Sequence, residues 1–356
     1  MTTQAVKIFG PGKAEIAEVP IPKLRDGYVL VNVKAVGLNP TDWKALYRTE
    51  PPTGSRSGCD YAGIVEEVGG NLRKPFKKGD RIAGMAHGAY SQEPDFGAFG
   101  HYMIAMADVA MKIPDNLSFE EAATLGVSIV TVGQGLYRAL ELPLPTAPLR
   151  SPEPLLIYGG STATGIFGIQ YAKLSGLTVA ATASPHNHDY LKSLGVDAVF
   201  DYKSPQCAAD IKAWAEGQGK QLRKAWDCIG SEASATICAA ALSHDEEGSI
   251  YASLIPVDHK TLLATNPGVK ESLWTLGYDV FGYSYQAMGK ERPASLEELQ
   301  HGHKFWDLAR DLLEQGQIKT IRPTVNRDGS GLDGVLKGLA ELQEGKVSGE
   351  KLVYTL

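Results

Sequence analysis

The sequence predicts an α/β protein of two domains, in which a β-rich domain is followed by a doubly wound parallel sheet. Three observations lead to this fold class. The chain has 356 residues, which is long for one hydrophobic core. Short strand-like runs bounded by glycine fill roughly the first 110 residues, whereas strand-like and helix-like runs alternate after residue 154. Five prolines between Pro143 and Pro154 separate the two patterns.

In the first part of the chain, β-branched residues between turn glycines predict strands, and Val29–Val36 is the clearest example. Ser118, followed three residues later by Glu121, is a capping box that opens a helix toward Leu125. A second helix runs to about Leu140. The expected strands are 29–36, 63–69 and 80–84, an arrangement typical of a small barrel or sandwich.

After the prolines, apolar strands alternate with helices, as in a parallel sheet built from strand–helix–strand units. The final segment, 351–354, is strand-like, so we expect the chain to return to the first domain. The predicted domains are 1–150 with 290–356, and 151–289. The expected strands are 155–158, 178–182, 198–202, 224–228 and 249–254, and the expected helices are 166–174, 189–194 and 305–313.

The composition excludes several classes of protein. A net charge of -6 without a block of Lys and Arg argues against a nucleic-acid surface. No apolar run reaches the roughly 18 residues that cross a membrane. The N-terminus lacks the apolar core of a signal peptide, so we expect a cytoplasmic protein.

The cysteines and histidines predict no metal site. The four cysteines, at 59, 207, 228 and 238, are far apart and form no CxxC pair. They are most simply reduced thiols that pack as small apolar groups. The histidine pairs 186/188 and 301/303 have no further ligand at a suitable spacing.

The strongest motif is a buried strand, a turn of small residues and a helix start between Leu155 and Gly165. Small residues in this turn let the backbone approach a pyrophosphate, whose charge then lies at the helix N-terminus. Ser161, Thr162 and Thr164 would add hydroxyl donors. The middle glycine of G-x-G-x-x-G is absent, so the motif gains its specificity from its place at the first strand–helix turn of the sheet. It predicts a Rossmann dinucleotide-binding domain.

The end of the second strand favours NADPH over NADH. An NAD site places Asp or Glu there to bind the ribose 2′-hydroxyl, about 20 residues past the glycines. This chain has Ser184, Pro185, His186 and Asn187 instead, and none of them would repel a 2′-phosphate. Ser184 as N-cap and Pro185 as first helical residue predict a helix N-terminus beside that phosphate. Tyr202, after the third strand, either lies against the adenine or packs in the core.

Several segments, in this order, resemble the medium-chain dehydrogenase/reductase superfamily, and specifically its zinc-free quinone-oxidoreductase-like branch. The resemblance covers nearly the whole chain. It implies a GroES-like catalytic domain formed by the N-terminal part and the C-terminal tail, with the Rossmann domain inserted between them. The matching segments are Asn39-Pro40-Thr41-Asp42, 58–63, 78–81 and 97–99.

The zinc ligands of that superfamily are not matched. Its zinc-dependent members have a cysteine near Thr41 and a His-Glu pair at Cys59-Asp60, and the four-cysteine zinc lobe is also missing from this chain. Zinc-free members usually reduce an activated C=C bond conjugated to a carbonyl group. The resemblance therefore implies a zinc-independent reductase.

Four segments, 142–145, 158–164, 184–187 and 274–277, resemble more closely the fungal trans-acting enoyl reductases. Those enzymes serve polyketide synthases whose own enoyl reductase domain is inactive. The resemblance implies that the cofactor is lined by Thr41, Asp42, Trp43, Lys44, Ser161, Thr162, Ala163, Thr164, Ser184, Pro185, His186, Asn187, Tyr202, Leu254, Ile255, Val347 and Ser348. It implies a substrate channel lined by Thr131, Val132, Gly133, Gln134, Gly135, Leu136, Tyr137, Arg138, Gly277, Tyr278, Asp279, Val280 and Phe281.

The implied reaction is hydride transfer from NADPH to the β-carbon of an enoyl thioester, followed by protonation of the α-carbon. Lys44 is the candidate active-site cation because it follows the segment that flanks the nicotinamide in relatives; a solvated surface lysine is the alternative. Thr131 is the second candidate catalytic residue and would bond the nicotinamide ribose or amide. Tyr47 either donates a proton or packs, and protonation by bulk water is a further alternative.

The implied partner is a polyketide synthase that carries the substrate on an acyl carrier protein, and we expect the reductase to be a monomer or a homodimer. Arg48 and Arg56 either belong to a local basic patch for the acidic carrier or are ordinary surface arginines. Gly133 and Gly135 would leave room in the channel. Two other functions remain open: a stand-alone quinone or enone reductase, and a non-catalytic NADPH-binding module.

Overall fold

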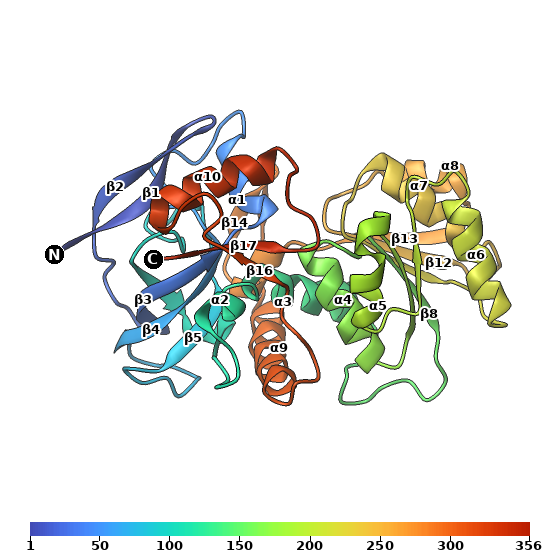
Figure 1. The fold of residues 1–356 in the computed structure, drawn as a ribbon, viewed down its shortest axis with the longest axis horizontal. Helices are drawn as coiled ribbons and strands as arrows, with labels where there is room; N and C mark the ends of the chain where they lie inside the picture. The colour runs from blue at the N-terminus through green and yellow to red at the C-terminus, as the bar shows by residue number, and fades with distance from the viewer. The chain divides into compact units, whose positions relative to one another are not determined.

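The computed structural model describes residues 1–356 and divides into two compact units (Figure 1). The first unit contains Met1–Val130 and Tyr278–Leu356, and the second contains Thr131–Gly277. The second unit is therefore inserted in the sequence of the first. The proline-rich segment, taken above as the domain boundary, lies within the second unit, because the helix that precedes it packs on the sheet of that unit.

A seven-stranded sheet forms the body of the first unit. Its strand order is β16-β17-β3-β4-β5-β7, and β6 also pairs with β3. β17 runs antiparallel to β3, which confirms that the end of the chain returns to the first domain. The elements are β1 (Thr2–Gly10), β2 (Lys13–Pro20), β3 (Tyr28–Gly37), α1 (Pro40–Leu46), β4 (Asp60–Val68), β5 (Arg81–Met85), β6 (Tyr102–Met106), η1 (Ala107–Val109), β7 (Ala110–Lys112), α2 (Phe119–Ala122), α3 (Gly126–Val132), η4 (Gly277–Phe281), β14 (Tyr285–Ala287), β15 (Lys290–Arg292), α9 (Leu296–Glu314), β16 (Pro323–Val325), α10 (Gly331–Gln343) and β17 (Lys351–Thr355).

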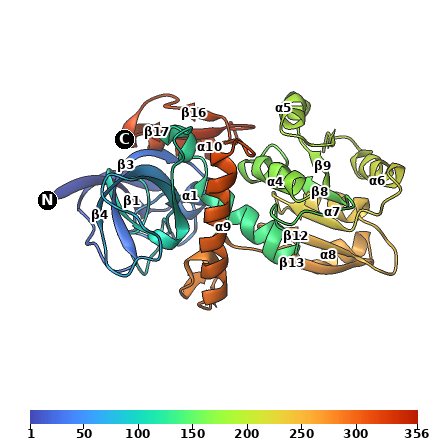
Figure 2. The same ribbon diagram turned by 90° about the horizontal axis from the view of Figure 1, so that it is seen from below.

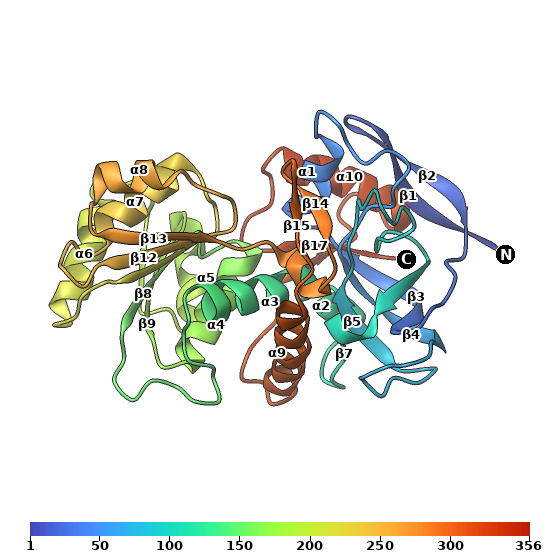
Figure 3. The same ribbon diagram turned by 180° about the vertical axis from the view of Figure 1, so that it is seen from behind.

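The core of the first unit is built on the alternation of β3. Val29, Val31 and Val33 are at most 1% exposed, as expected for one face of a strand. Leu339 from α10 and Tyr354 from β17 pack in the same core, so both stretches of the chain contribute to it. Figure 3 shows α10 beside α1.

The second unit contains a six-stranded parallel sheet with the order β10-β9-β8-β11-β12-β13. This is the doubly wound order, in which the direction of winding reverses between β8 and β11. Helices α4 and α5 cover one face and α6, α7 and α8 the other (Figures 1 and 3). The elements are η2 (Gly133–Ala139), β8 (Pro154–Tyr158), α4 (Ala163–Leu174), β9 (Thr178–Thr182), η3 (Pro185–Asn187), α5 (His188–Ser193), β10 (Ala198–Phe200), α6 (Cys207–Gly217), β11 (Lys224–Asp227), α7 (Glu232–Ala241), β12 (Ser249–Ser253), α8 (His259–Thr265) and β13 (Val269–Trp274).

Two predicted helices differ in extent from the observed ones. The capping box at Ser118 is confirmed, since its hydroxyl accepts from the Glu121 amide at 3.1 Å, but the helix breaks after Ala122. The late helix, α9, is longer than predicted and is seen along its length in Figure 2. It begins at Leu296 because Ser295 caps it, accepting from the Glu298 amide at 3.2 Å.

None of the helices combines the length and the hydropathy that a membrane-spanning helix requires.

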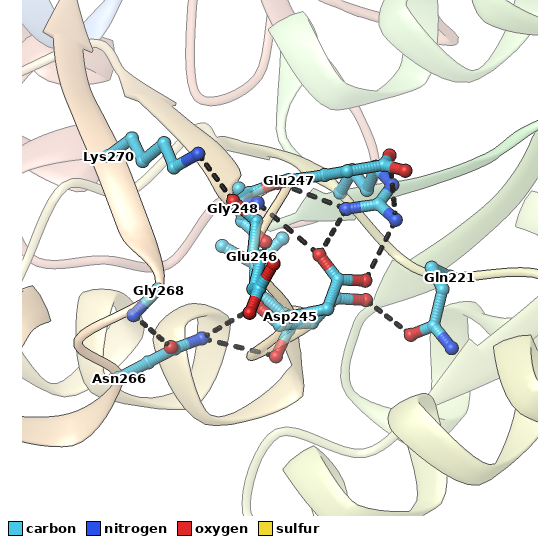
Figure 4. Close-up of polar contacts among 12 residues, drawn as sticks. Gln221, Asp245, Glu246, Glu247, Gly248, Asn266, Gly268 and Lys270 are labelled. Atoms are coloured by element: carbon cyan, nitrogen blue, oxygen red, sulfur yellow. Dashed lines mark hydrogen bonds and ion pairs between the residues drawn. The ribbon is translucent and has the colours of Figure 1, made fainter.

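The amino edge of the parallel sheet is held by polar contacts around the loop before β12 (Figure 4). Asn266 is fully buried, and its Oδ1 accepts from the Gly268 amide at 2.8 Å. Its Nδ2 donates to the carbonyl oxygens of residues 239, 242 and 243 at 3.0, 3.2 and 3.3 Å. At the exposed side of this loop, Lys270 Nζ donates to the carbonyl of Glu246 at 2.6 Å. These contacts fix the edge opposite to the predicted cofactor motif.

Candidate functional site

Four predicted cofactor segments follow strands of the second unit. Ser161–Thr164 follows β8, Ser184–Asn187 follows β9, Tyr202 follows β10 and Leu254–Ile255 follows β12. Because all strands of this sheet are parallel, the four segments lie at its carboxyl edge. The winding reverses beside β8, and doubly wound sheets bind ligands at that position. The structure therefore places these four segments along one edge of the sheet.

The turn after β8 is shaped for close approach of the backbone to a ligand. Gly159 has φ +79°, which glycine adopts without strain. A Cβ on Gly160 would lie 2.8 Å from the Cβ of Ala181, and one on Gly165 would lie 2.4 Å from the carbonyl oxygen of Gly159. In the first turn of α4, a helix of 12 residues, the amides of Ala163 and Thr164 have no partner within the helix and are donors of the kind that suits a pyrophosphate.

Thr162 has a different role from the one predicted. Its Oγ1 accepts from the Gly165 amide at 3.0 Å and donates to the carbonyl of Gly159 at 2.8 Å. The hydroxyl caps α4, and its single proton is used within the turn. Of the three predicted hydroxyl donors, Ser161 and Thr164 remain.

Ser184 also differs from expectation. It occupies the N-cap position, but its side chain does not cap the helix; its Oγ lies 3.2 Å from the Tyr202 hydroxyl. The helix it precedes is a short 3₁₀ turn followed by the six residues of α5, so the helix N-terminus is a weaker anion site than expected. Tyr202 is 36% exposed and so does not pack in the core. Two neighbouring hydroxyls thus mark the carboxyl ends of β9 and β10.

The sequence analysis missed Asp227, the last residue of β11. Its buried carboxylate accepts from the amides of Ile229 and Gly230 at 2.8 and 3.0 Å, and from the Tyr251 hydroxyl at 2.7 Å. These bonds hold Ile229, which is 43% exposed, beside Gly159. The available signal was a buried strand followed by Asp and a turn glycine, which is too common to single out.

Thr41 and Lys44 lie on helix α1 of the first unit. They are three residues apart and so share a face of the helix. Burial lowers the pKa of Lys44. Its ammonium has no carboxylate partner and lies 5.8 Å from the centre of the Trp43 ring. Lys44 is thus a cation with unused hydrogen-bond donors.

Other predicted residues near α1 serve the packing of the first unit. The Asp42 side chain is 2% exposed, and Oδ2 accepts from the amide of Asn39 at 2.7 Å, so this carboxylate is turned into the unit rather than toward a cofactor. Trp43 and Val347 pack against one core, and exposed Ser348 follows. Tyr47 packs against the turn at Gly12 while remaining 44% exposed, which favours the packing alternative.

A buried ammonium group lies at the positions where zinc-dependent relatives carry ligands. Lys351, which is 2% exposed, donates to Asn39 Oδ1 at 2.9 Å and to the carbonyl of Thr124 at 3.1 Å, and it also pairs with Asp60. Across the 356 residues, no group of three or more His, Cys, Asp or Glu side chains is placed to hold a metal ion. The donor set around Cys59 therefore does not fit zinc.

The predicted channel residues 131–138 are largely buried in the second unit. Thr131 is 7% exposed, and Leu136 is fully buried. They lie on the end of α3 and on η2, a π-helix, which is a form frequent at functional sites. Gly135 does not leave room for a substrate, because a Cβ there would lie 2.3 Å from Trp226 Nε1. Tyr137 bonds Ser175 at 2.9 Å, inside the same unit.

In the second predicted channel segment, 277–281, most side chains are buried or paired within the first unit, and Tyr278 is the exception. Asp279 accepts from the Tyr285 hydroxyl at 2.8 Å and pairs with Arg292. Val280 and Phe281 are buried at 1% and 4% exposure. Tyr278 differs from these residues because its hydroxyl lies 2.8 Å from Thr41 Oγ1.

Of the two arginines predicted to form a basic patch for the acyl carrier protein, Arg56 is buried and Arg48 is exposed. Arg56 is fully buried, its Nη1 donates to the carbonyl of Tyr102 at 2.6 Å, and desolvation lowers its pKa to about 10. It cannot contact an acidic carrier. Arg48 is exposed and remains available.

Two family profiles match the chain. Residues 25–115 match the alcohol dehydrogenase GroES-like domain, and residues 163–286 match the family described as zinc-binding dehydrogenase. Among solved structures, the chain is similar to the CurK enoyl reductase, with a TM-score of 0.76 and 18% identity over 99% of both chains. It is also similar to a quinone oxidoreductase from Coxiella burnetii, with a TM-score of 0.71 and 22% identity over 100% of both chains. These structures confirm the GroES-like and Rossmann folds.

Closer relatives are found among characterised fungal proteins. The chain is 44% identical to the trans-enoyl reductase ACTTS2 of Alternaria alternata, over 100% of this chain and 99% of that one. It is 44% identical to the trans-enoyl reductase resD of Aspergillus sclerotiorum, over 99% of each chain. It is 48% identical to the trans-enoyl reductase TOXD of Cochliobolus carbonum, over 80% of this chain and 93% of that one.

Proposed function

Since the chain belongs to the trans-enoyl reductases of the medium-chain dehydrogenase/reductase superfamily, we propose that it uses NADPH to reduce the C=C bond of an α,β-unsaturated thioester presented by a polyketide synthase. The observation that carries this proposal is the similarity over the full chain to trans-enoyl reductases, together with a carboxyl sheet edge built for a dinucleotide.

The residues at the carboxyl edge fit NADPH. The glycines of the turn 159–165 leave no room for larger side chains, and the amides of Ala163 and Thr164 at the start of α4 can donate to a pyrophosphate. Ser184 and Tyr202 offer two adjacent hydroxyls and no carboxylate where a 2′-phosphate would bind. Lys203 adds a cation near this pair, 6.0 Å from the Tyr202 ring. These groups favour the phosphorylated cofactor over NADH.

When bound, NADPH supplies the hydride for the β-carbon of the substrate. The protein's task is then to stabilise negative charge on the thioester oxygen. Lys44 fits this task, because a partly buried ammonium without a carboxylate partner keeps its donors for the substrate. Thr131 is retained as the residue that orients the nicotinamide.

The reductase works without zinc in this proposal. The ammonium of Lys351 already neutralises Asp60 and binds Asn39, so a second cation there would be repelled. Polarisation of the substrate then falls to hydrogen-bond donors of the protein rather than to a Lewis acid.

The decisive experiment compares substrates at matched concentrations. Purified protein is incubated with NADPH and either 2-butenoyl-pantetheine, 2-butenoyl loaded on an acyl carrier protein, a simple enone or a free quinone. We expect kcat/KM to be highest for the carrier-bound thioester, and the encounter with the carrier to weaken with salt. Equal turnover of free quinones would favour a stand-alone reductase. Failure to oxidise NADPH with every substrate would favour a binding module.

A further inference from the structure

Thr41 is the outer member of a buried chain of polar side chains in the first unit. Its Oγ1 lies 2.8 Å from the Tyr278 hydroxyl, and that hydroxyl lies 3.4 Å from Cys59 Sγ. Cys59 is 1% exposed, and the carboxyl of Asp42 follows it. Asp42 Oδ1 is buried without a hydrogen-bond partner at ordinary distance. The contacts therefore join Cys59, Tyr278 and Thr41, and the carboxyl of Asp42 lies next to Cys59 at the inner end.

The ring of Tyr278 is fixed by an aromatic stack. It lies 4.2 Å from the ring of His87 at an interplanar angle of 15°, and His87 stacks in turn on Tyr90 at 4.2 Å and 5°. His87 Nδ1 is also 2.9 Å from the Tyr283 hydroxyl. Burial lowers the pKa of His87 to about 3, so the stacked imidazole is neutral. The Tyr278 hydroxyl is thus held in one place by packing.

We propose that this chain is a positioning device that turns the Thr41 hydroxyl outward as a hydrogen-bond donor, and that Thr41 and Lys44 together stabilise the enolate oxygen of the substrate. The inference rests on the proposed enoyl reductase function. Thr41 and Lys44 share one face of α1, so two donors point from the same surface. Thr41 keeps its proton throughout, since a hydrogen bond to the enolate requires no transfer.

The direction of the chain depends on the charge of Asp42. When Asp42 is protonated, the Cys59 thiol does not have to donate to it and can donate to Tyr278, which donates to Thr41, and the Thr41 proton is left for the substrate. An ionised Asp42 only accepts, so every bond reverses and the Thr41 proton turns inward. Polar chains of this kind are cooperative, so one end determines the orientation at the other.

The surroundings of Asp42 favour its protonated form below about pH 7. Desolvation raises the pKa of its carboxyl to about 7. The amide of Asn39 acts against this rise, as do the Cys59 thiol and Lys351 from β17, whereas the charge of Asp60 on β4 adds to it. Activity should therefore fall as pH rises through about 7.

Tyr278→Phe tests the chain, because it keeps the aromatic stack and removes the hydroxyl. We expect kcat with thioester and saturating NADPH to fall about tenfold, while the NADPH dissociation constant changes little.

Thr41→Val should lower kcat by roughly 100-fold, and Thr41→Ser should keep most of the wild-type kcat. The double variant Thr41→Val/Tyr278→Phe should be no slower than Thr41→Val alone, since both act on one hydroxyl.

Tyr354→Phe is the matched control, because it removes a buried tyrosine hydroxyl of the same unit that donates to the carbonyl of Arg327 and touches neither the aromatic stack nor Thr41. It should lower the melting temperature as much as Tyr278→Phe while leaving kcat unchanged.

Asp42→Asn, whose amide mimics the protonated acid, should abolish the fall of activity above pH 7. Additive losses in the double variant, or wild-type kcat in Tyr278→Phe, would overturn the proposal. If the wild-type protein reduces no enoyl thioester, the proposed function fails instead, and the two failures are distinct.

Discussion

Asp42 is a buried acid whose ionisation opposes folding. Its pKa rises from 3.8 to about 7 because of desolvation, so the native state binds a proton that the unfolded state releases. Stability from this group is complete below pH 3.8 and is lost as pH rises through about 7. The two pKa values differ by an amount worth at most about 4 kcal/mol. We expect Asp42→Asn to raise the free energy of unfolding in urea more at pH 8 than at pH 5.5. Equal gains at both pH values would contradict this origin.

Ser184 sits where the cofactor's distinguishing phosphate would bind. Ser184→Asp places a carboxylate beside the Tyr202 hydroxyl, so it should repel a 2′-phosphate and accept from a 2′-hydroxyl. The dissociation constant for NADPH should rise by one or two orders of magnitude, and that for NADH should fall. Titration of intrinsic fluorescence measures both. Ser151→Asp, which adds the same charge in the exposed segment before β8, is the control and should leave both constants unchanged. Similar affinities of the wild-type protein for NADH and NADPH would count against the site.

Lys44 has no structural partner that would explain its partial burial. Lys44→Ala should therefore lower kcat/KM for the thioester by more than threefold, which corresponds to about 0.7 kcal/mol or more. The melting temperature should stay within a degree or two, since no ion pair is lost. Lys23→Ala removes the same charge from an exposed position in the same unit. If both variants behave alike, Lys44 is a solvated surface lysine.

At the scale of elements, Asn266 links α7, α8 and β13 at the amino edge of the sheet. Asn266→Ala removes two amide protons that are shared among three carbonyl oxygens, and one accepted bond, from a fully buried side chain. At about 1 kcal/mol per bond, the free energy of unfolding should fall by roughly 2–4 kcal/mol. Lys270→Ala, which removes the exposed contact shown in Figure 4, should change it by less than about 0.5 kcal/mol. If the two variants lost similar amounts of unfolding free energy, burial of the side chain would not explain how much each contact contributes to stability.

Local patterns predicted the elements, and long-range contacts decided what several residues do. β9 spans 178–182 as expected, because a short apolar run between Gly176 and Ser184-Pro185 needs no tertiary information. The π-helix at 133–139 was not predictable, since it depends on how Gly135 meets Trp226. The capping role of Thr162 had a local signal, its position before a helix, which the hydroxyl-donor interpretation overlooked. The contact of Tyr278 with Thr41 joins residues 237 apart and leaves no trace in either segment.

For the whole molecule, the absence of a zinc requirement is the clearest prediction. The buried ammonium of Lys351 pairs with Asp60, so this carboxylate is already neutralised without a metal. We expect full enoyl reductase activity after exhaustive treatment with EDTA and 1,10-phenanthroline, and no stoichiometric metal by elemental analysis. One zinc per chain, with activity lost on its removal and regained on its return, would overturn this account.

The split first unit has a consequence for biosynthesis. The register places Val353 of β17 opposite Gly37 of β3, so β3 pairs with a strand that is synthesised long after it. The second unit is one continuous stretch, 131–277, and can complete its sheet while the last strand is still unmade. Until β17 is made, the Ala35–Gly37 end of β3 is unpaired on one side and Asp60 lacks its ammonium partner. A chain without β17 would therefore expose part of a strand edge and leave the buried carboxylate of Asp60 without a compensating charge.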